Sequence, residues 1–248
     1  MAKLTAEKIT MSFEGERVIE DVSLHLNEGE IVSLLGVSGS GKSTIFNVLS
    51  GLYSPDEGKV FLDNTDITGK AGKISYMLQK DLLLPHYTII DNVSLPLVIK
   101  GEKKKAAREK ADPLFKEFGL EGTQKKYPSE LSGGMKQRAA LLRTYLASEG
   151  VALLDEPFSA LDTITKSAIH SWYLDIMKKI NLSTIFVTHD IDEAILLSDR
   201  IYILSGKPGR ITDEIRIELP KPRSNKDVMT EPFIEYKKMI AEKIAFVF

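Results

Sequence analysis

Hydrophobic and polar residues alternate in short runs over residues 8–35. Ile9-Thr10-Met11-Ser12-Phe13 is one such run, and Val22-Ser23-Leu24-His25-Leu26 is another. Turn-forming residues separate the runs at Glu14-Gly15 and Asn27-Glu28-Gly29. Alternation with a period of two places the apolar side chains on one face, so this pattern predicts antiparallel strands joined by turns.

A compact apolar run from Ile31 to Leu35 breaks this alternation and predicts a buried parallel strand. A helix is predicted from Ser43 to Leu49, ended by Ser50-Gly51. Further strands or hairpins are predicted at residues 58–68, 73–79, 151–154, 184–188 and 200–204. Strands that alternate with helices indicate an α/β fold, with a parallel sheet covered on both faces.

The character of the chain changes between Asp91 and Ser148, where helical patterns replace strands. Lys103 to Ala111 is rich in strong helix formers and charge, and Pro113 breaks or restarts this helix. Met135 to Ala147 predicts a second helix. We therefore expect a helical subdomain, over about residues 91–148, inserted into the α/β core.

The end of the chain has a pattern of its own after Ser205. Glycines and prolines between residues 206 and 222 predict a hairpin and a linker. Residues 227–248 predict an amphipathic helix with Phe233, Tyr236 and Ile240 on one face. We expect one main domain over about residues 1–240, its core formed by about 1–90 and 149–205, and a C-terminal extension over 206–248.

Composition narrows the possible partners. The 33 basic and 35 acidic residues among 248 give a net charge of −2, so no overall positive field attracts nucleic acid. The absence of cysteine excludes disulfides and thiolate chemistry. No apolar run approaches the roughly 18 residues that span a bilayer. We expect a chain that does not insert directly into a membrane and that reaches one only through a partner.

The first candidate site is the loop Gly36-Val37-Ser38-Gly39-Ser40-Gly41-Lys42-Ser43-Thr44. It fits the P-loop pattern, lying after a predicted strand and before a predicted helix. Its glycines let backbone N–H groups turn toward phosphate oxygens, and the helix N-terminus adds a positive dipole end. Lys42 is expected to reach the β- and γ-phosphates and Ser43 to ligate Mg²⁺. The motif indicates a nucleotide without choosing among kinases, GTPases and motors.

Asp155 and Glu156 follow directly after the apolar strand at residues 151–154. A carboxylate at the carboxyl end of a parallel strand lies on the ligand side of the sheet. Asp155 is expected to orient Mg²⁺, and Glu156 to polarise the attacking water. The alternative is a surface turn with two solvated acids. His189, at the end of the strand at 184–188, is a candidate sensor of the γ-phosphate, although a lone histidine is more often structural.

The chemistry of the segment Leu131-Ser132-Gly133-Gly134-Met135-Lys136-Gln137-Arg138 is that of a second anion site, although the same sequence taken alone is more often a simple Ser-Gly-Gly loop before a helix. Ser132 caps the predicted helix, and the glycines expose N–H groups at its head. This segment resembles the signature sequence of ATP-binding cassette (ABC) ATPases. The order of P-loop, Gln79, signature, Asp155-Glu156 and His189 resembles the ABC nucleotide-binding subunit from about Lys3 to Leu204.

The resemblance implies a P-loop NTPase with a RecA-like parallel-sheet core, an N-terminal antiparallel β subdomain and a helical insertion. It implies ATP and Mg²⁺, with Phe13 stacking on adenine, Val18 beside the nucleotide and Gln79 linking Mg²⁺ to a transmembrane partner. Glu156 resembles the catalytic carboxylate, His189 the switch histidine and Asp162 the aspartate of the dimer-contact loop. The family pairs two subunits head to tail, so that Ser132, Gly133 and Gly134 act on the partner subunit's ATP.

The C-terminal stretches Pro208-Gly209-Arg210-Ile211 and Leu219-Pro220-Lys221-Pro222-Arg223 resemble the nitrate/sulfonate/taurine importer ATPases, a group that also serves thiamine-precursor pyrimidines. His86-Tyr87 departs from the Trp-Arg pair that is frequent in this group. The resemblance implies a homodimer on the inner face of the cell membrane, bound to permease subunits and, through them, to a solute-binding protein. Standalone ATPases of lipoprotein release or of iron–sulfur assembly are the alternatives, and a regulatory ATP sensor without turnover is the competing hypothesis.

Overall fold

The computed structural model describes residues 2–159 and 163–245, and its central feature is a mixed sheet of six strands. The strand order is β10-β9-β3-β8-β7-β6, with β6, β7, β8, β3 and β9 parallel and β10 antiparallel at the edge. The bounds are β3 (Ile31–Gly36), β6 (Ser75–Met77), β7 (Val151–Asp155), β8 (Ser183–Thr188), β9 (Arg200–Ser205) and β10 (Arg210–Arg216).

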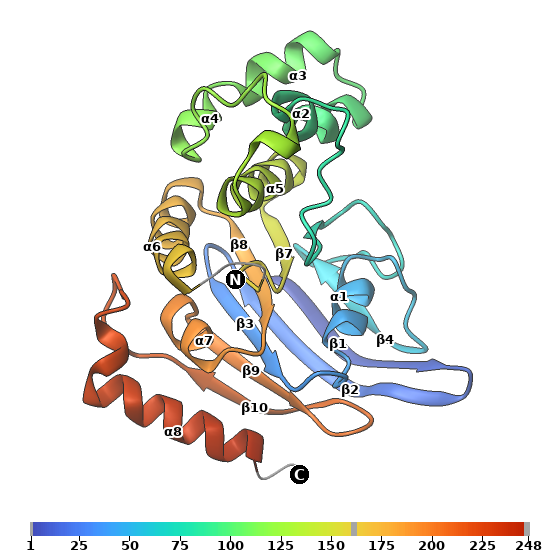
Figure 1. Cartoon of the computed structure of the whole chain (residues 1–248). Coiled ribbons are helices and arrows are strands. Elements are labelled where there is room, and N and C mark those ends of the chain that lie inside the picture. Colours follow the sequence, from blue (N-terminus) through green and yellow to red (C-terminus); the bar gives the residue numbers. More distant parts are fainter. Residues whose placement is uncertain (1, 160–162, 246–248) are drawn as a thin grey trace.

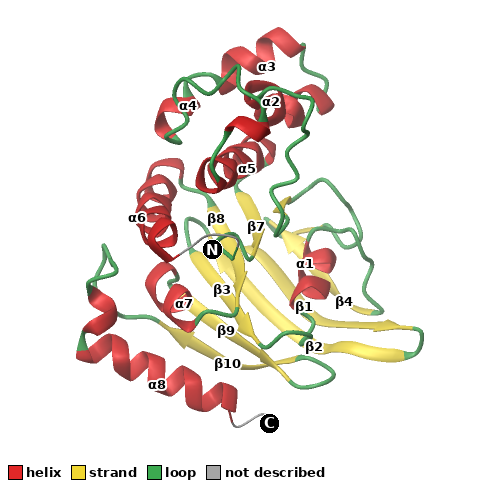
Figure 2. Cartoon of the chain, in the orientation of Figure 1, coloured by secondary structure: helices red, strands yellow, loops and turns green. Residues whose placement is uncertain are grey.

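A second, antiparallel sheet of four strands has the order β2-β1-β4-β5. Its bounds are β1 (Ala2–Phe13), β2 (Glu16–Asn27), β4 (Glu57–Leu62) and β5 (Thr65–Asp66). The alternation at the start of the sequence therefore predicted the correct pairing, and β1 begins earlier than the predicted pattern. Figure 2 shows the two sheets lying side by side, with the helices gathered around and above them.

Apart from α1, which follows β3, the helices fall into three groups (Figure 1). Helices α2 to α5 form the upper end of the molecule in this view, α6 and α7 lie beside the six-stranded sheet, and α8 runs along β10 at the lower end. The bounds are α1 (Lys42–Leu49), α2 (Ile89–Ile99), α3 (Lys104–Ala111), α4 (Leu114–Glu117), α5 (Gly133–Ala147), α6 (Thr163–Ile180), α7 (Ile191–Leu197) and α8 (Glu231–Ala245).

Two predicted helix starts shift, each for a local reason. The signature helix begins at Gly133 because Ser132 supplies the N-cap, with its Oγ accepting the Met135 N–H at 3.3 Å. The terminal helix begins at Glu231, after a separate single turn at Asp227–Met229. Pro113 restarts a helix, as α4, by standing at its N-cap. The bounds of α6 and α7 were not predicted from the sequence.

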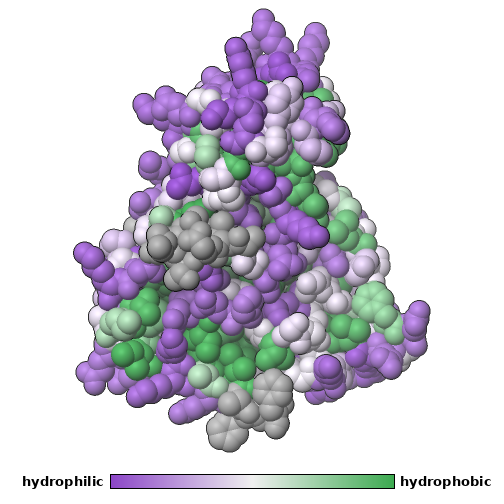
Figure 3. All heavy atoms as spheres, in the orientation of Figure 1, coloured by the Kyte–Doolittle hydropathy of each residue, from purple (hydrophilic) through white to green (hydrophobic). Residues whose placement is uncertain are grey.

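Strands that read as continuous apolar runs face two different hydrophobic cores. In β8, Ile185 and Val187 join a cluster with α1 and the antiparallel sheet, and Phe186 joins a cluster with α2 to α8. Successive strand residues point to opposite faces, so one run serves both cores. On the face drawn in Figure 3, hydrophilic side chains cover much of the helical end. Within the described residues, no helix is both long and apolar enough to cross a membrane.

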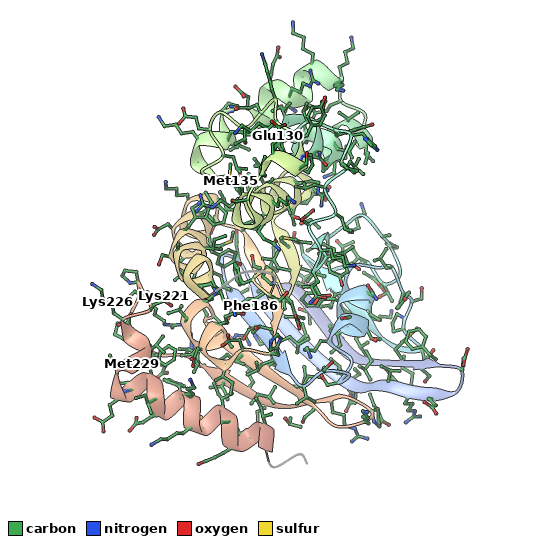
Figure 4. The ribbon with its side chains drawn as sticks, viewed as in Figure 1. Glu130, Met135, Phe186, Lys221, Lys226 and Met229 are labelled. Carbon is green, nitrogen blue, oxygen red and sulfur yellow. The ribbon has the colours of Figure 1, made fainter. Side chains whose placement is uncertain are left out.

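We predict that Phe186→Ala lowers the free energy of unfolding by about 3–5 kcal/mol, because the substitution leaves a cavity at a fully buried position. Figure 4 labels this side chain within the sheet. Urea unfolding followed by circular dichroism measures the change. The control is Ile99→Ala at a site with 76% exposure, where we expect a change within about 0.5 kcal/mol. A loss below about 1 kcal/mol for Phe186→Ala would contradict the two-core description.

Candidate functional site

The loop from Gly36 to Thr44 connects β3 to α1, as the sequence predicted, and its glycines stand where side chains do not fit. A Cβ at Gly36 would lie 2.4 Å from the Leu204 carbonyl oxygen, and one at Gly41 would lie 2.5 Å from the Ile19 Cγ2. Gly41 also has φ 97° and forms the N-cap of α1. The close approach and the positive φ both require glycine, and they leave the N–H groups at the head of α1 open to a ligand.

Lys42 lies inside this loop and is 8% exposed. Its ammonium donates to the carbonyl oxygens of Gly36 at 2.8 Å and Val37 at 2.7 Å. Burial lowers the pKa of this ammonium, while the charges of Glu156 and Asp155 act to raise it. A buried cation held by neutral loop carbonyls can exchange them for charged phosphate oxygens, which form stronger charge-assisted bonds.

Asp155, the last residue of β7, faces the loop. Its Oδ2 accepts a hydrogen bond from Ser43 Oγ at 3.5 Å and another from the Tyr76 hydroxyl at 3.3 Å. Burial raises the pKa of the Asp155 carboxyl, with the neighbouring Glu156 adding to the shift, against the lowering effects of Tyr76, Lys42 and Ser43. The site thus holds a carboxylate in an environment that favours a cation beside it.

Glu156 connects the ends of three strands. Its Oε1 lies 3.1 Å from His189 Nδ1, and its Oε2 accepts a hydrogen bond from Gln79 Nε2 at 3.0 Å. Glu156 has φ 44°, a left-handed conformation that is uncommon for a residue with a side chain. The structure therefore brings Glu156, His189 and Gln79 together, and backbone strain stands at the residue expected to act on water.

A cavity of about 710 Å³ joins these groups. Described residues from the phosphate loop, the acidic strand end and the histidine strand line it: Val18, Ser38, Gly39, Gly41, Lys42, Ser43, Thr44, Gln79, Asp155, Glu156, Val187 and His189. Val18 therefore lines the same cavity as the phosphate loop. Phe13 does not appear among the lining residues; its ring is 40% exposed and meets Tyr53 edge-on, with centroids 5.6 Å apart.

The signature residues lie apart from this cavity. Ser132, Gly133 and Gly134 stand at the head of α5, whose first turn carries no acidic residue. Glu130 and Met135, labelled in Figure 4, mark this head within the helical end of the molecule. None of the three signature residues lines the cavity at the phosphate loop in the described part of the chain. Asp162, predicted at the dimer contact, lies outside the described residues.

Two contacts of the site were not predicted from the sequence. Tyr76 reaches Asp155 because β6 and β7 pair in parallel with Tyr76 opposite Leu153, a register that the sequence does not reveal. Ser159 Oγ accepts a second, longer bond from Gln79 at 3.4 Å. The sequence did contain one indication of the Tyr76 contact. Tyr76 lies inside an apolar run, and a buried hydroxyl requires a hydrogen-bond partner.

A family model described as ABC transporter matches residues 19–159. The chain belongs to the ABC transporter family. Its activity is ATP hydrolysis, and the predicted fold class, a P-loop NTPase with an N-terminal antiparallel sheet and added helices, is confirmed.

Individual relatives agree with this assignment. The formylaminopyrimidine import ATP-binding protein ThiZ of Halalkalibacterium halodurans is 46% identical over 215 residues, covering 86% of this chain and 84% of that protein. The aliphatic sulfonates import ATP-binding protein SsuB of Bacillus cereus is 39% identical over 230 residues, covering 93% and 89%. A dimeric ATP-binding cassette in a post-hydrolysis state, bound to ADP and Pi, has a TM-score of 0.74 and 30% identity, covering 88% of this chain and 100% of that one.

We predict that Asp155→Asn raises the thermal unfolding midpoint of the nucleotide-free ABC ATPase at pH 8. Because the folded-state pKa of Asp155 is raised, the ionised carboxylate opposes folding above the unfolded-state pKa, and the amide removes this cost. Differential scanning calorimetry at pH 8 and at pH 5 measures the effect, which should be smaller at pH 5. The same substitution should weaken magnesium-dependent nucleotide binding. An unfolding midpoint that falls at pH 8 would contradict the raised pKa of the Asp155 carboxyl.

Proposed function

We propose that this chain is the ATP-hydrolysing subunit of an ABC importer that works as a homodimer beneath separate permease subunits. The import names of ThiZ and SsuB support the direction of transport. They favour import over the lipoprotein-release and iron–sulfur alternatives. The observation that carries the catalytic part is the position of Glu156, held between Gln79 and His189 at the edge of a cavity whose opposite wall is the phosphate loop.

In this proposal the phosphates of ATP lie against the N–H groups of residues 38–44, and Lys42 turns from the loop carbonyls to the β- and γ-phosphates. Glu156 orients and polarises the water that attacks the γ-phosphate. His189 contacts the γ-phosphate and exchanges its bond to Glu156 as hydrolysis proceeds. Val18, with Phe13 from the adjacent strand end, receives the adenine side of the nucleotide.

The residues present fit a magnesium ion. Ser43 Oγ and Asp155 Oδ2 are hard oxygen donors only 3.5 Å apart beside the phosphate loop, and Gln79 adds an amide oxygen nearby. When bound, Mg²⁺ would neutralise charge that develops on the phosphate oxygens. Ser43 and Asp155 would hold it, and Gln79 would relate its position to the permease.

The position of the signature residues supports the proposal that the chain acts as a pair. Ser132, Gly133 and Gly134 offer N–H groups at the head of α5 away from the chain's own phosphate loop. In a head-to-tail homodimer, these groups and Asp162 would meet the ATP held by the partner subunit. The dimeric cassette bound to ADP and Pi supports this arrangement.

The transported substrate is proposed to be a small solute of the nitrate, sulfonate, taurine or thiamine-precursor type. The C-terminal resemblance and the names of the two relatives support this class. A solute-binding protein delivers the solute to the permease, and the ATPase dimer lies on the cytoplasmic face of the membrane through its permease contact.

We predict that Glu156→Gln lowers kcat for ATP hydrolysis by about 100-fold or more, with ATP affinity unchanged within about threefold, because the amide cannot accept a proton from water. Phosphate release and binding of a fluorescent ATP analogue measure the two quantities. Glu109→Gln, at an exposed surface position on α3, is the matched control and should retain full turnover. Full activity in Glu156→Gln would remove Glu156 from its role, and a wild-type chain that binds ATP without releasing phosphate, even with permease present, would favour the ATP-sensor hypothesis.

A further inference from the structure

The segment from Gln79 to Thr88 joins the strand β6 to the helix α2 and touches both parts of the molecule. At its start, Gln79 donates to Glu156 Oε2 at 3.0 Å and to Ser159 Oγ at 3.4 Å. Further along, the segment is held by side chains of the helical end. The position of Gln79 beside Glu156 therefore depends on what fixes the residues that follow it.

Arg143 of α5 provides the first of these attachments. Its Nη1 donates to the Leu82 carbonyl oxygen at 2.8 Å, and its Nη2 donates to the Asp81 carbonyl oxygen. No carboxylate forms an ion pair with this guanidinium in the part of the chain that the structure describes. Burial lowers the pKa of Arg143, the charge of Asp81 acts to raise it, and the two main-chain carbonyls further compensate the partly desolvated charge. A planar guanidinium that spans two consecutive carbonyls fixes both the place and the direction of the chain.

Asn92 of α2 provides the second attachment and is completely buried. Its Oδ1 accepts the Leu84 N–H at 2.7 Å, and its Nδ2 donates to the carbonyl oxygens of Leu84 and Tyr87 at 3.1 Å. At the first attachment, Leu82 takes a left-handed conformation with φ 44°. A strained, mostly exposed segment keeps such a conformation only when its surroundings impose it. The part of the segment after Asp81 therefore moves with the helices.

Helix α5 connects this attachment to the anion site at its head. It runs without interruption from Gly133 to Ala147, and Ser132 caps it. A rise of 1.5 Å per residue places Arg143 about 15 Å along the helix from Gly133. A single helix of this length moves as a rod. Any displacement of Ser132 that accompanies contact with phosphate is therefore passed to the carbonyls of Asp81 and Leu82.

We propose that Arg143 is a positioning residue that couples the phosphate contact at Ser132 to the placement of Gln79 against Glu156. This inference rests on the proposed function, because Ser132 meets phosphate only from a partner subunit. The bonds of Arg143 go to the residues beyond Gln79, so its influence on Glu156 passes through the segment. The coupling acts in both directions: a permease that moves the segment also moves the head of α5.

A double-mutant cycle with Arg143→Met and Gln79→Ala tests this route, with kcat and KM for ATP measured by phosphate release on the full chain. We expect Arg143→Met alone to lower kcat by about 3- to 10-fold with KM unchanged within about twofold, an effect of about 1 kcal/mol in coupling. In the Gln79→Ala background the same substitution should change kcat by less than about twofold, because the residue through which it acts is gone. Arg143→Lys, which keeps the charge but reaches one carbonyl at a time, should be intermediate.

Lys100→Met is the matched control. Lys100 also donates to a main-chain carbonyl of α5, that of Ala147 at 2.9 Å, but it joins α2 to the far end of the helix. We expect this variant to keep kcat within about twofold in both backgrounds. Equal losses for Arg143→Met in the two backgrounds, or no loss in either, would overturn the inference while wild-type turnover persists. If Arg143→Met fails to fold, Arg143→Lys takes its place, and a wild-type kcat for Arg143→Lys would overturn the inference. Absence of turnover in the wild type would instead overturn the proposed function.

Discussion

The structure depends on the close approach of neighbouring strands to the backbone of the phosphate loop. Gly36 leaves no room for a Cβ against the Leu204 carbonyl of β9, and Gly41 leaves none against Ile19 of β2. Each sheet therefore presses on one end of the loop, and the N–H groups at the head of α1 are held open between them. The binding cavity is a consequence of how the two sheets meet, since neither sheet alone shapes this loop.

The C-terminal hairpin closes a third side of the same loop. Gly209 exchanges backbone hydrogen bonds with β2, donating to the Val18 carbonyl at 2.9 Å and accepting from Glu20 N–H at 3.0 Å. A Cβ at Gly209 would lie 2.0 Å from the Ser40 carbonyl oxygen. Farther on, Arg223 donates to the carbonyls of Ile195 and Ser198 at the end of α7. The stretches that resemble the importer group thus attach the C-terminal part to the nucleotide site and to the core.

Much of this arrangement follows from the sequence, for reasons that are local. The loop Gly36 to Thr44 and the acids Asp155-Glu156 are contiguous motifs at strand ends, so their chemistry can be predicted from consecutive residues. The bond from Tyr76 to Asp155 and the attachment of Arg143 to Leu82 could not be predicted from neighbouring residues. They depend on strand register and on the placement of a helix. The placement of Phe13 against adenine stays a prediction, since its ring meets Tyr53 outside the cavity lining.

The central claim is that each ATP site is shared, with the phosphate loop of one chain facing Ser132 to Gly134 of another. Sedimentation velocity of the Glu156→Gln chain, with and without Gly134→Asp, tests it most directly. Aspartate in the first turn favours the helix but repels phosphate, so it leaves α5 intact. We predict that Mg-ATP, and not Mg-ADP, converts Glu156→Gln from monomer to dimer, and that adding Gly134→Asp keeps the ATP-bound chain monomeric. A dimer that forms equally well with Gly134→Asp would contradict the account.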